Sequence, residues 1–208
     1  MFKDRFIVIE GLEGAGKSTA VNVIKEFLSN NGINEIVQCR EPGGTKLGET
    51  IRDLVKSNRS NEKIDCRTEL LLMYASRIQL VENVIKPALQ EGKTVICDRF
   101  YYSTYAYQGG GRGIDLDIID SIHKASLGNF KPDLTIYMDI APEIGLKRAA
   151  GRGELDRFEL EKIEFFEKTR SMYLKQAGDS PEVVTVDASQ SQENVAEQVR
   201  RILSSRES

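Results

Sequence analysis

The 208-residue sequence contains no tryptophan, one histidine, three cysteines and five prolines. Cys39, Cys66 and Cys97 are widely spaced and form no C-x-x-C pair, which favours reduced thiols over a disulfide framework or a zinc site. His123 lies in a polar helical stretch, where we expect it to be solvated. Histidine-based catalysis is therefore not expected, and the cysteines indicate a cytoplasmic protein.

The sequence also lacks an excess of positive charge and a long apolar run. Its 29 basic and 32 acidic residues give a formal net charge of -3, so it has no overall charge pattern for DNA or RNA, although a local cationic pocket is compatible with it. No apolar segment suits a signal peptide or a membrane span. With 40% hydrophobic and 29% charged residues, the composition is that of a globular protein, and the length favours one large domain. We expect no nucleic-acid or membrane partner.

Short apolar strands alternate with helical segments along the whole sequence. Such alternation requires crossovers between parallel strands, so we predict an α/β fold with a mostly parallel sheet and helices on both faces. Pro87 is expected to kink or end the longest helix, and residues 56–63 are expected to form a surface loop. The predicted strands are 6–9, 33–39, 94–97, 134–140 and 183–186, and the predicted helices are 17–30, 47–55, 68–89, 115–127, 142–150, 156–177 and 192–203.

The clearest motif lies between the first strand and the first helix. Residues 11–18, GLEGAGKS, match the phosphate-loop pattern G-x-x-x-x-G-K-[ST]. The glycines allow backbone N–H groups to surround a polyphosphate, while Lys17 can reach the β- and γ-phosphates and Ser18 can ligate Mg²⁺. Glu13 is unusual here, because a carboxylate about 4 Å from a triphosphate charge is repelled by about 1–4 kcal/mol. We expect Glu13 to point away and to accept a hydrogen bond from a sugar hydroxyl of a second substrate; the alternative is a solvated carboxylate.

Several charged side chains occupy positions where ligands bind. Asp98 and Arg99 follow the strand at residues 94–97, at the sheet edge where α/β proteins hold their ligands. Asp98 could hold Mg²⁺ through water and Arg99 could bind a phosphate, or the two could form a structural ion pair. Arg77 interrupts an apolar helix face, so it either extends to solvent or projects into a pocket to bind a base. Arg52 could add a phosphate contact.

Two further segments have the composition of binding elements. Arg148, Arg152 and Arg157 surround two glycines between helices, which favours a lid that closes on the transferring phosphoryl group over an ordinary basic loop. Residues 101–113 contain four of the seven tyrosines together with hydroxyl and amide side chains. This composition favours a pocket for a nucleobase and sugar over purely structural packing.

Together these motifs resemble the bacterial thymidylate kinases. The strings that carry the resemblance run in the family's order from about residue 5 to residue 170, and the EPGGT string separates this family from other small P-loop kinases. An acidic residue in the phosphate loop with arginines in the lid is similar to a bacterial subgroup. The strings are EGLEGAGKS at 10–18, REPGGT at 40–45, DRF at 98–100, AYQGGGRG at 106–113 and RGELDR at 152–157.

The resemblance implies a P-loop nucleoside monophosphate kinase fold with a five-stranded parallel sheet, a homodimer, and phosphorylation of dTMP to dTDP by ATP with Mg²⁺, for DNA synthesis. Residues 1–208 would form a single thymidylate kinase domain with a lid at about residues 148–157. The implied catalytic residues are Lys17, Arg99 and Arg152, and the implied Mg²⁺ ligands are Ser18 and Asp98. The implied ATP contacts are Gly11, Leu12, Glu13, Gly14, Ala15, Gly16, Lys17, Ser18, Thr19 and Arg148. The implied dTMP contacts are Glu13, Glu41, Pro42, Arg52, Met73, Arg77, Arg99, Ser103, Thr104, Tyr107 and Gln108.

The resemblance also assigns roles within the dTMP set. Arg77 would bond the thymine edge, and Arg52 and Arg99 would bond the phosphate. Tyr107 would crowd a ribose 2′-hydroxyl. The sequence departs from the family at Met73, where a phenylalanine often stacks on thymine, and at Ala150, where related lids often carry another arginine.

Two other functions remain open at this stage. One is a nucleoside kinase or another nucleotide kinase on the same scaffold. The other is a non-enzymatic, nucleotide-dependent switch, which the absence of an N-K-x-D string disfavours.

Overall fold

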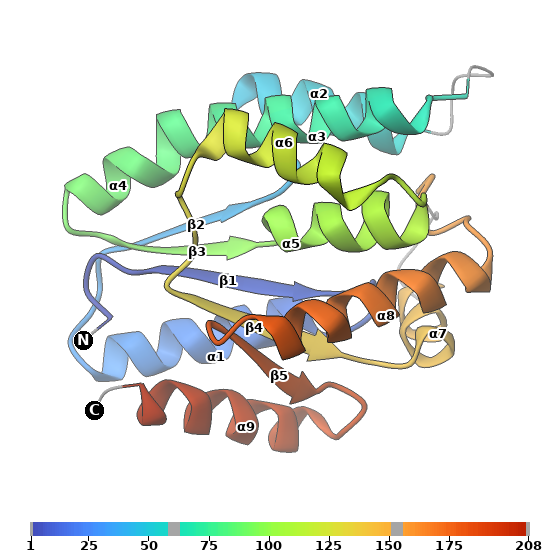
Figure 1. Ribbon diagram of the computed structural model, residues 1–208. Coiled ribbons are helices and arrows are strands. Elements are labelled where there is room, and N and C mark those ends of the chain that lie inside the picture. Colours follow the sequence, from blue (N-terminus) through green and yellow to red (C-terminus); the bar gives the residue numbers. More distant parts are fainter. Residues whose placement is uncertain (1, 58–62, 151–155, 207–208) are drawn as a thin grey trace.

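The computed structural model describes residues 2–57, 63–150 and 156–206. A five-stranded, all-parallel sheet in the order β2-β3-β1-β4-β5 forms its centre (Figure 1). All six residues of β1 are buried, as expected of a central strand of apolar and β-branched residues. The predicted fold class is confirmed. The strands are β1 Phe6–Gly11, β2 Ile36–Arg40, β3 Thr94–Asp98, β4 Leu134–Asp139 and β5 Val183–Asp187.

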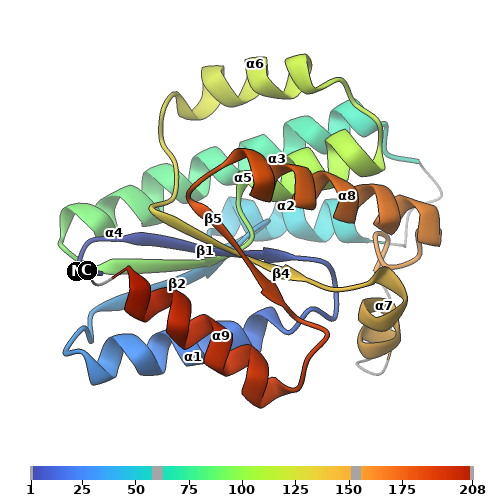
Figure 2. The same ribbon diagram turned by 60° about the horizontal axis from the view of Figure 1, so that its bottom comes forward.

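Helices cover both faces of the sheet (Figure 2). On one face lie α1 (Lys17–Asn30) and α9 (Gln192–Ser205). On the other lie α3 (Cys66–Leu80), α4 (Lys86–Gln90), α5 (Tyr101–Thr104) and α8 (Ile163–Asp179), with α2 (Lys46–Lys56) beside α3 and α6 (Leu116–Leu127) outside it. Helix α7 (Pro142–Ala150) follows β4, and two π-helical stretches are η1 (Val81–Ile85) and η2 (Tyr105–Gly111). Among the described residues, no helix has the length and apolarity needed to cross a membrane.

Buried aromatic pairs tie the central strands to the segments packed against them. The Tyr137 ring of β4 stacks on the Tyr173 ring of α8 with centroids 4.8 Å apart. Phe6, the first residue of β1, packs edge-on against Phe100, which lies two residues after β3, at 5.0 Å. Because these aromatic pairs are fully buried, they hold β4 against α8 and β1 against the segment that follows β3.

The long helix predicted at residues 68–89 is present without a break, but its hydrogen-bonding geometry changes along its length. It consists of α3, the π-helical η1 and α4. Pro87 lies in the first turn of α4, where a missing N–H removes no hydrogen bond from that helix. Pro87 therefore does not end the helix, which continues to Gln90. Instead, the helical geometry changes to π-helical in the turn before it.

The helix predicted from Asp156 begins seven residues later, at Ile163. Asp156 and Glu159 form a capping box, since Asp156 Oδ1 accepts from the Glu159 N–H at 3.1 Å and Glu159 Oε2 accepts from the Asp156 N–H at 3.0 Å. It caps only a turn, however. The prediction is wrong because Phe158 turns into the protein, where it is 7% exposed, so its packing interrupts helix propagation.

His123 is half-buried rather than solvated, contrary to the prediction. Its ring lies 4.6 Å from that of Tyr101 and contacts the rings of Tyr74 and Tyr105. Burial, together with the positive charge of Arg77, lowers the pKa of His123. The prediction was wrong because the side of α6 that carries His123 faces the tyrosines of α3, α5 and η2, and Asp120 on the same side accepts a hydrogen bond from one of them, Tyr105.

Candidate active site

The phosphate loop connects β1 to α1 at the carboxyl edge of the sheet. Gly14 and Gly16 have φ values of 74° and 83°, in the left-handed region that favours glycine. A Cβ atom on Gly14 would lie 2.0 Å from the carbonyl oxygen of Gly145 in α7. The loop is thus held closely against α7, and its backbone conformation requires these two glycines.

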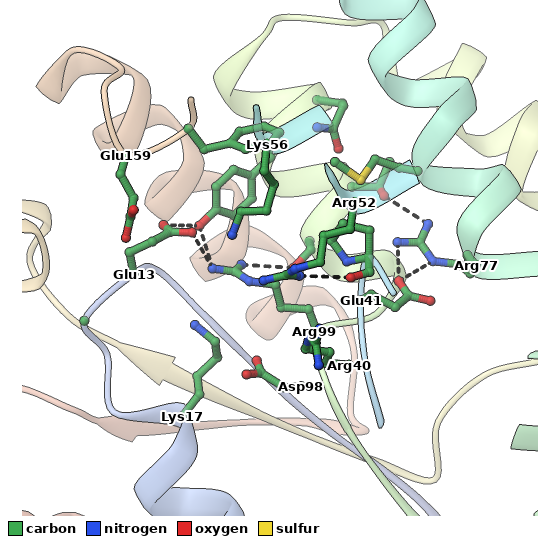
Figure 3. Close-up of a pocket in the computed structure, with 18 residues that line it drawn as sticks. Glu13, Lys17, Arg40, Glu41, Arg52, Lys56, Arg77, Asp98, Arg99 and Glu159 are labelled. Atoms are coloured by element: carbon green, nitrogen blue, oxygen red, sulfur yellow. Dashed lines mark hydrogen bonds and ion pairs between the residues drawn. The ribbon is translucent and has the colours of Figure 1, made fainter. Parts of the chain in front are cut away.

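Lys17 lies at the start of α1 with its charge directed toward the cavity (Figure 3). Its Nζ atom donates to the carbonyl oxygens of Gly11 and Leu12 at 3.2 and 3.1 Å. Burial, and next the positive charge of Arg99, lower the pKa of Lys17 to about 8. Because these two hydrogen bonds are long, the Lys17 ammonium group can exchange them for hydrogen bonds to a bound phosphate at little cost in free energy.

Asp98 ends β3 beside Lys17, and its Oδ1 atom is buried without a hydrogen-bond partner. An unpaired buried carboxylate oxygen attracts a cation or a bound water. No group of three or more His, Cys, Asp or Glu side chains in the described ranges has metal-binding geometry. Magnesium in kinases, however, takes most of its ligands from phosphates and water. The donors Asp98 and Ser18 fit that chemistry.

A cavity of about 240 Å³ opens beside the phosphate loop (Figure 3). It lies between the end of β1, the end of β3, and the elements α2, α3 and η2. Lys17 and Asp98 line it as well. All the residues expected to contact dTMP line this one cavity: Glu13, Glu41, Pro42, Arg52, Met73, Arg77, Arg99, Ser103, Thr104, Tyr107 and Gln108.

Arg99 lies in the middle of the cavity wall in a strained backbone conformation, with φ at 71°. Left-handed backbone at a non-glycine residue costs about 1–3 kcal/mol and is concentrated at functional sites. Its Nη2 atom donates to Glu13 Oε1 at 2.8 Å and to Tyr107 Oη at 3.0 Å. The alternative of an Asp98–Arg99 ion pair is wrong, since Arg99 pairs with Glu13 instead.

Glu13 points into the cavity, where Arg99 and Tyr107 donate to its carboxylate (Figure 3). Its Oε2 atom accepts from the Tyr107 hydroxyl at 2.6 Å, and its side chain is 17% exposed. Although burial raises the pKa of Glu13, the charges of Arg99 and Lys17 outweigh burial and hold it below the usual value. The alternative of a solvated carboxylate is therefore wrong, and Glu13 remains ionised near the position expected for a sugar.

Arg77 and Glu41 form a buried ion pair at the other end of the cavity (Figure 3). Arg77 Nε donates to Glu41 Oε2 at 2.7 Å, and Arg77 Nη1 donates to Thr104 Oγ1 at 3.0 Å. Burial raises the pKa of Glu41 to about 7, and Glu41 Oε1 has no partner. Arg77 is 2% exposed, so of its two predicted orientations the structure shows the one that faces a pocket.

The tyrosine-rich segment divides between packing and binding. Of its four tyrosines, only Tyr107 lines the cavity. Tyr101 and Tyr102 stack on each other in the core, and Tyr105 donates to Asp120. The segment forms α5 and η2, which brings Ser103, Thr104 and Gln108 to the cavity with Tyr107.

The arginines assigned to the lid do not gather in the described part of the chain. Arg148 donates to the carbonyl oxygens of Ala188 and Ser189, after β5, and does not line the cavity. Arg157 is held by Glu69 and by the Val55 carbonyl. Arg152 lies outside the described residues.

Four residues that line the cavity were not assigned to it from the sequence: Arg40, Lys56, Phe158 and Glu159. Lys56 was placed in a surface loop, which is wrong, since it ends α2 and pairs with Asp156 at 2.5 Å. Residues 58–62 of that predicted loop lie outside the described residues. Phe158 and Glu159 belong to the capping-box turn, and no local pattern shows that they turn toward the cavity. A role for Glu10 was not predicted either. This residue is fully buried behind the cavity, where its carboxylate accepts hydrogen bonds from the Phe100 N–H and the Ser103 hydroxyl.

Known proteins are similar to this chain over nearly its whole length. A family model described as thymidylate kinase matches residues 9–199. A thymidylate kinase of Vibrio vulnificus is 56% identical over 203 residues, which is 98% of this chain and 96% of that protein, and one of Vibrio parahaemolyticus is 53% identical over 203 residues, covering 98% and 97%. A crystal structure of thymidylate kinase from Ehrlichia chaffeensis superposes with a TM-score of 0.76 at 32% identity, covering 97% of this chain and 99% of that one. With its phosphate loop, its acceptor-sized cavity and these relatives, the chain belongs to the thymidylate kinase family.

Proposed function

We propose that the cavity beside the phosphate loop is where this chain carries out the reaction of its family, with residues 1–208 acting as one kinase domain. As a thymidylate kinase, the chain phosphorylates dTMP to dTDP with ATP as the donor. One observation supports this site above all others: a single cavity gathers every residue expected to contact dTMP and also reaches Lys17 and Asp98 of the donor side.

The donor side is formed by residues 11–19. ATP phosphates would lie on the N–H groups of the glycine loop at the start of α1, and Lys17 would leave the two loop carbonyls for the β- and γ-phosphates. Arg148, beside the loop after β5, would lie near the nucleoside part of ATP. Mg²⁺ would be held by Ser18 and, through water, by Asp98, and when bound it would neutralise charge on the β- and γ-phosphate oxygens.

The acceptor side is formed by the rest of the cavity. Arg99 and Arg52 supply guanidinium groups for the dTMP phosphate, and Arg52 is already oriented by its bond to the Pro42 carbonyl at 2.9 Å. Arg77, held by Glu41 and Thr104, faces the thymine edge. Ser103, Gln108 and Met73 would line the base, while Glu13 and Tyr107 would contact the deoxyribose and leave little room for a 2′-hydroxyl.

The transfer itself needs no general base. An oxygen of the dTMP phosphate, already anionic, attacks the γ-phosphorus in line, and the bond from that phosphorus to the ADP oxygen breaks. Lys17 and Arg99 align the two anions and offset their repulsion, so positioning and electrostatics provide the rate.

Arg152 is proposed as a third catalytic cation, in a lid at about residues 148–157. The Arg152→Ala variant should lower kcat by about 10³-fold or more, because a guanidinium that stabilises transferring charge acts mainly in the transition state. Its Kd for dTMP should change little in a calorimetric titration. Wild-type turnover in this variant would contradict the assignment.

Assembly and location are part of the proposal. We propose a homodimer in the cytoplasm, without nucleic-acid or membrane partners. Support for a dimer comes from large apolar side chains exposed on the outer surface of three neighbouring helices, α2, α3 and α6, which we term the apolar stripe. Its members are Leu47, Leu54, Leu71, Ile78 and Ile118.

An acceptor panel tests the proposed function. Purified protein is supplied with ATP and Mg²⁺ and, in separate reactions, with dTMP, dUMP, CMP or thymidine, and ADP release is measured. We expect dTMP to give the highest kcat/KM. If thymidine is the best acceptor, or if ADP release does not depend on any acceptor, the proposal is wrong.

A further inference from the structure

Glu69 is a buried carboxylate behind the cavity. It lies in the first turn of α3 and is 0% exposed, yet it does not line the cavity itself. Its Oε1 atom accepts from Gln108 Nε2 at 2.7 Å and from Arg112 Nε at 3.2 Å. Its Oε2 atom accepts from Arg112 Nη2 at 3.2 Å and from Arg157 Nη2. Four donors from three side chains thus converge on one carboxylate.

These donors come from separate segments of the chain. Gln108 belongs to η2, Arg112 follows it directly, and Arg157 belongs to the turn after residue 156. Arg157 extends the connection to the end of α2, because its Nε donates to the Val55 carbonyl at 2.7 Å. One carboxylate on α3 therefore joins η2, the turn at 157–160 and, through Arg157, α2.

The partners of Glu69 carry two parts of the cavity wall. Gln108 lines the cavity directly. Phe158 lines it as well, and its ring lies against both arginines, 4.5 Å from the Arg157 guanidinium and 5.6 Å from that of Arg112. Phe158 also meets the ring of Tyr107 edge-on at 6.1 Å. Hence the two arginines held by Glu69 form the support on which Phe158 rests.

Glu69 also determines which way the Gln108 amide points. An ionised carboxylate only accepts hydrogen bonds, so the amide must present its NH₂ group to Glu69. The amide oxygen is then left for a bound acceptor. A neutral amide in place of Glu69 has one oxygen and one NH₂ group. If its oxygen accepts from Arg157, its NH₂ group faces Gln108, which must then turn its own amide oxygen toward position 69 and away from a bound acceptor.

We propose that Glu69 is a positioning residue for the acceptor nucleotide: it fixes the Gln108 amide and, through Arg112 and Arg157, the Phe158 wall, and so determines the affinity for dTMP without touching either substrate. The inference rests on the proposed acceptor site. It predicts an effect on dTMP binding that is separate from ATP binding, since none of the partners of Glu69 belongs to the phosphate loop.

Steady-state kinetics of the full chain carrying Glu69→Gln test the proposal. We expect KM for dTMP to rise about tenfold or more, equivalent to about 1.4 kcal/mol of lost binding, while KM for ATP stays within about twofold. The matched control is Glu161→Gln, which removes the other carboxylate on Arg112 but contacts neither Gln108 nor Arg157. Its KM for dTMP should stay within about twofold of the wild-type value.

A merely structural role would give a different result. In that case Glu69→Gln would lower the melting temperature and the active fraction but leave both KM values unchanged, or raise them together, and either outcome overturns the proposal. A double-mutant cycle adds a second criterion: in a Gln108→Ala background, the effect of Glu69→Gln on KM for dTMP should shrink, because part of it acts through Gln108. Full additivity would contradict that step.

A second variant, Arg157→Lys, tests the same support without changing Glu69. If Glu69→Gln does not fold, Arg157→Lys retains the charge but loses the two-sided contact with Glu69 and Val55, and it should still raise KM for dTMP selectively. An unchanged KM in that variant would overturn the proposal. If the wild-type chain does not phosphorylate dTMP, the proposed function itself fails; if it does and the variants show no selective change, only the role of Glu69 fails.

Discussion

Lys17 shows how the site changes the chemistry of a single residue. Its pKa is lowered to about 8, first by burial and then by Arg99, while Asp98 and Glu13 act in the opposite direction. Its protonation therefore changes in a pH range that assays reach. The same cavity contains Glu41, whose pKa is raised to about 7. We therefore expect the activity to depend on pH through Lys17 and the stability to depend on pH through Glu41.

The first prediction concerns the alkaline side of the pH profile. Because Lys17 must be charged to bind phosphates, kcat/KM for ATP should fall above about pH 8, whereas kcat at saturating ATP should fall only at higher pH, since bound phosphates favour the charged amine. Lys17→Arg should remove this fall, even if its rate is lower. A wild-type kcat/KM that is constant up to pH 9.5 would contradict the prediction.

The second prediction concerns stability on the acidic side. Since the pKa of Glu41 is about 7 in the folded protein and near 4.5 otherwise, the folded state binds more protons between these values, and stability should decrease by about 2–3 kcal/mol from this group as pH rises from 4.5 to 7. Glu41→Gln should make the pH dependence of urea unfolding shallower. Buried Glu10, whose pKa burial also raises, should leave part of the slope. Equal slopes in both proteins would refute the assignment.

At the scale of elements, the contact between η2 and α8 positions the part of the cavity wall formed by Tyr107 and Gln108. Gly110 permits this contact, because a Cβ atom there would lie 2.8 Å from the Lys168 carbonyl oxygen and 2.9 Å from Met172 Cβ of α8. A backbone carbonyl cannot move aside as a flexible side chain can. The position of η2, with Tyr107 and Gln108, therefore depends on a residue that does not itself line the cavity beside the phosphate loop.

The Gly110→Ala variant should separate these two elements. We expect a loss of about 1–3 kcal/mol in the free energy of unfolding by urea, together with a higher KM for dTMP, because η2 must shift. The matched control is Gly178→Ala in α8, where a Cβ atom meets nothing within 4 Å. That variant should be neutral or more stable by up to about 1 kcal/mol. Equal effects of the two substitutions would show that the close contact does not matter.

At the scale of the whole molecule, the proposed dimer predicts a response of the apolar stripe. Leu71→Arg on α3 should convert a dimer into a monomer in sedimentation equilibrium, because a charge would be buried at the interface. Leu160→Arg is the control: Leu160 is 61% exposed, similar to the 56% of Leu71, but lies outside the stripe. It should leave the mass unchanged. A monomeric wild-type chain, or an unchanged Leu71→Arg dimer, would contradict the proposal.

The sequence by itself determined the order of strands and helices, the parallel sheet and the phosphate loop. These features depend on local signals, namely β-branched apolar runs, helical spacing of apolar residues, and the glycines Gly14 and Gly16, which allow the left-handed backbone that the phosphate loop requires. The sequence also indicated most of the residues that line the cavity. Arg77 interrupts an apolar helix face and Arg99 follows an apolar strand, positions where a charge needs a partner or a ligand, whereas Glu41 and Pro42 were implied only by the resemblance to the family.

Only the tertiary structure decided which partner each charge takes. Arg99 binds Glu13 across the cavity rather than its neighbour Asp98, and Arg157 turns to the buried Glu69, 88 positions away in the sequence. The capping box at Asp156 yields a turn instead of a helix, and His123 faces three tyrosines. In each case a contact between distant segments outweighs a local preference of about 1 kcal/mol, because burial makes unpaired charge and unfilled space more costly than an altered helix end.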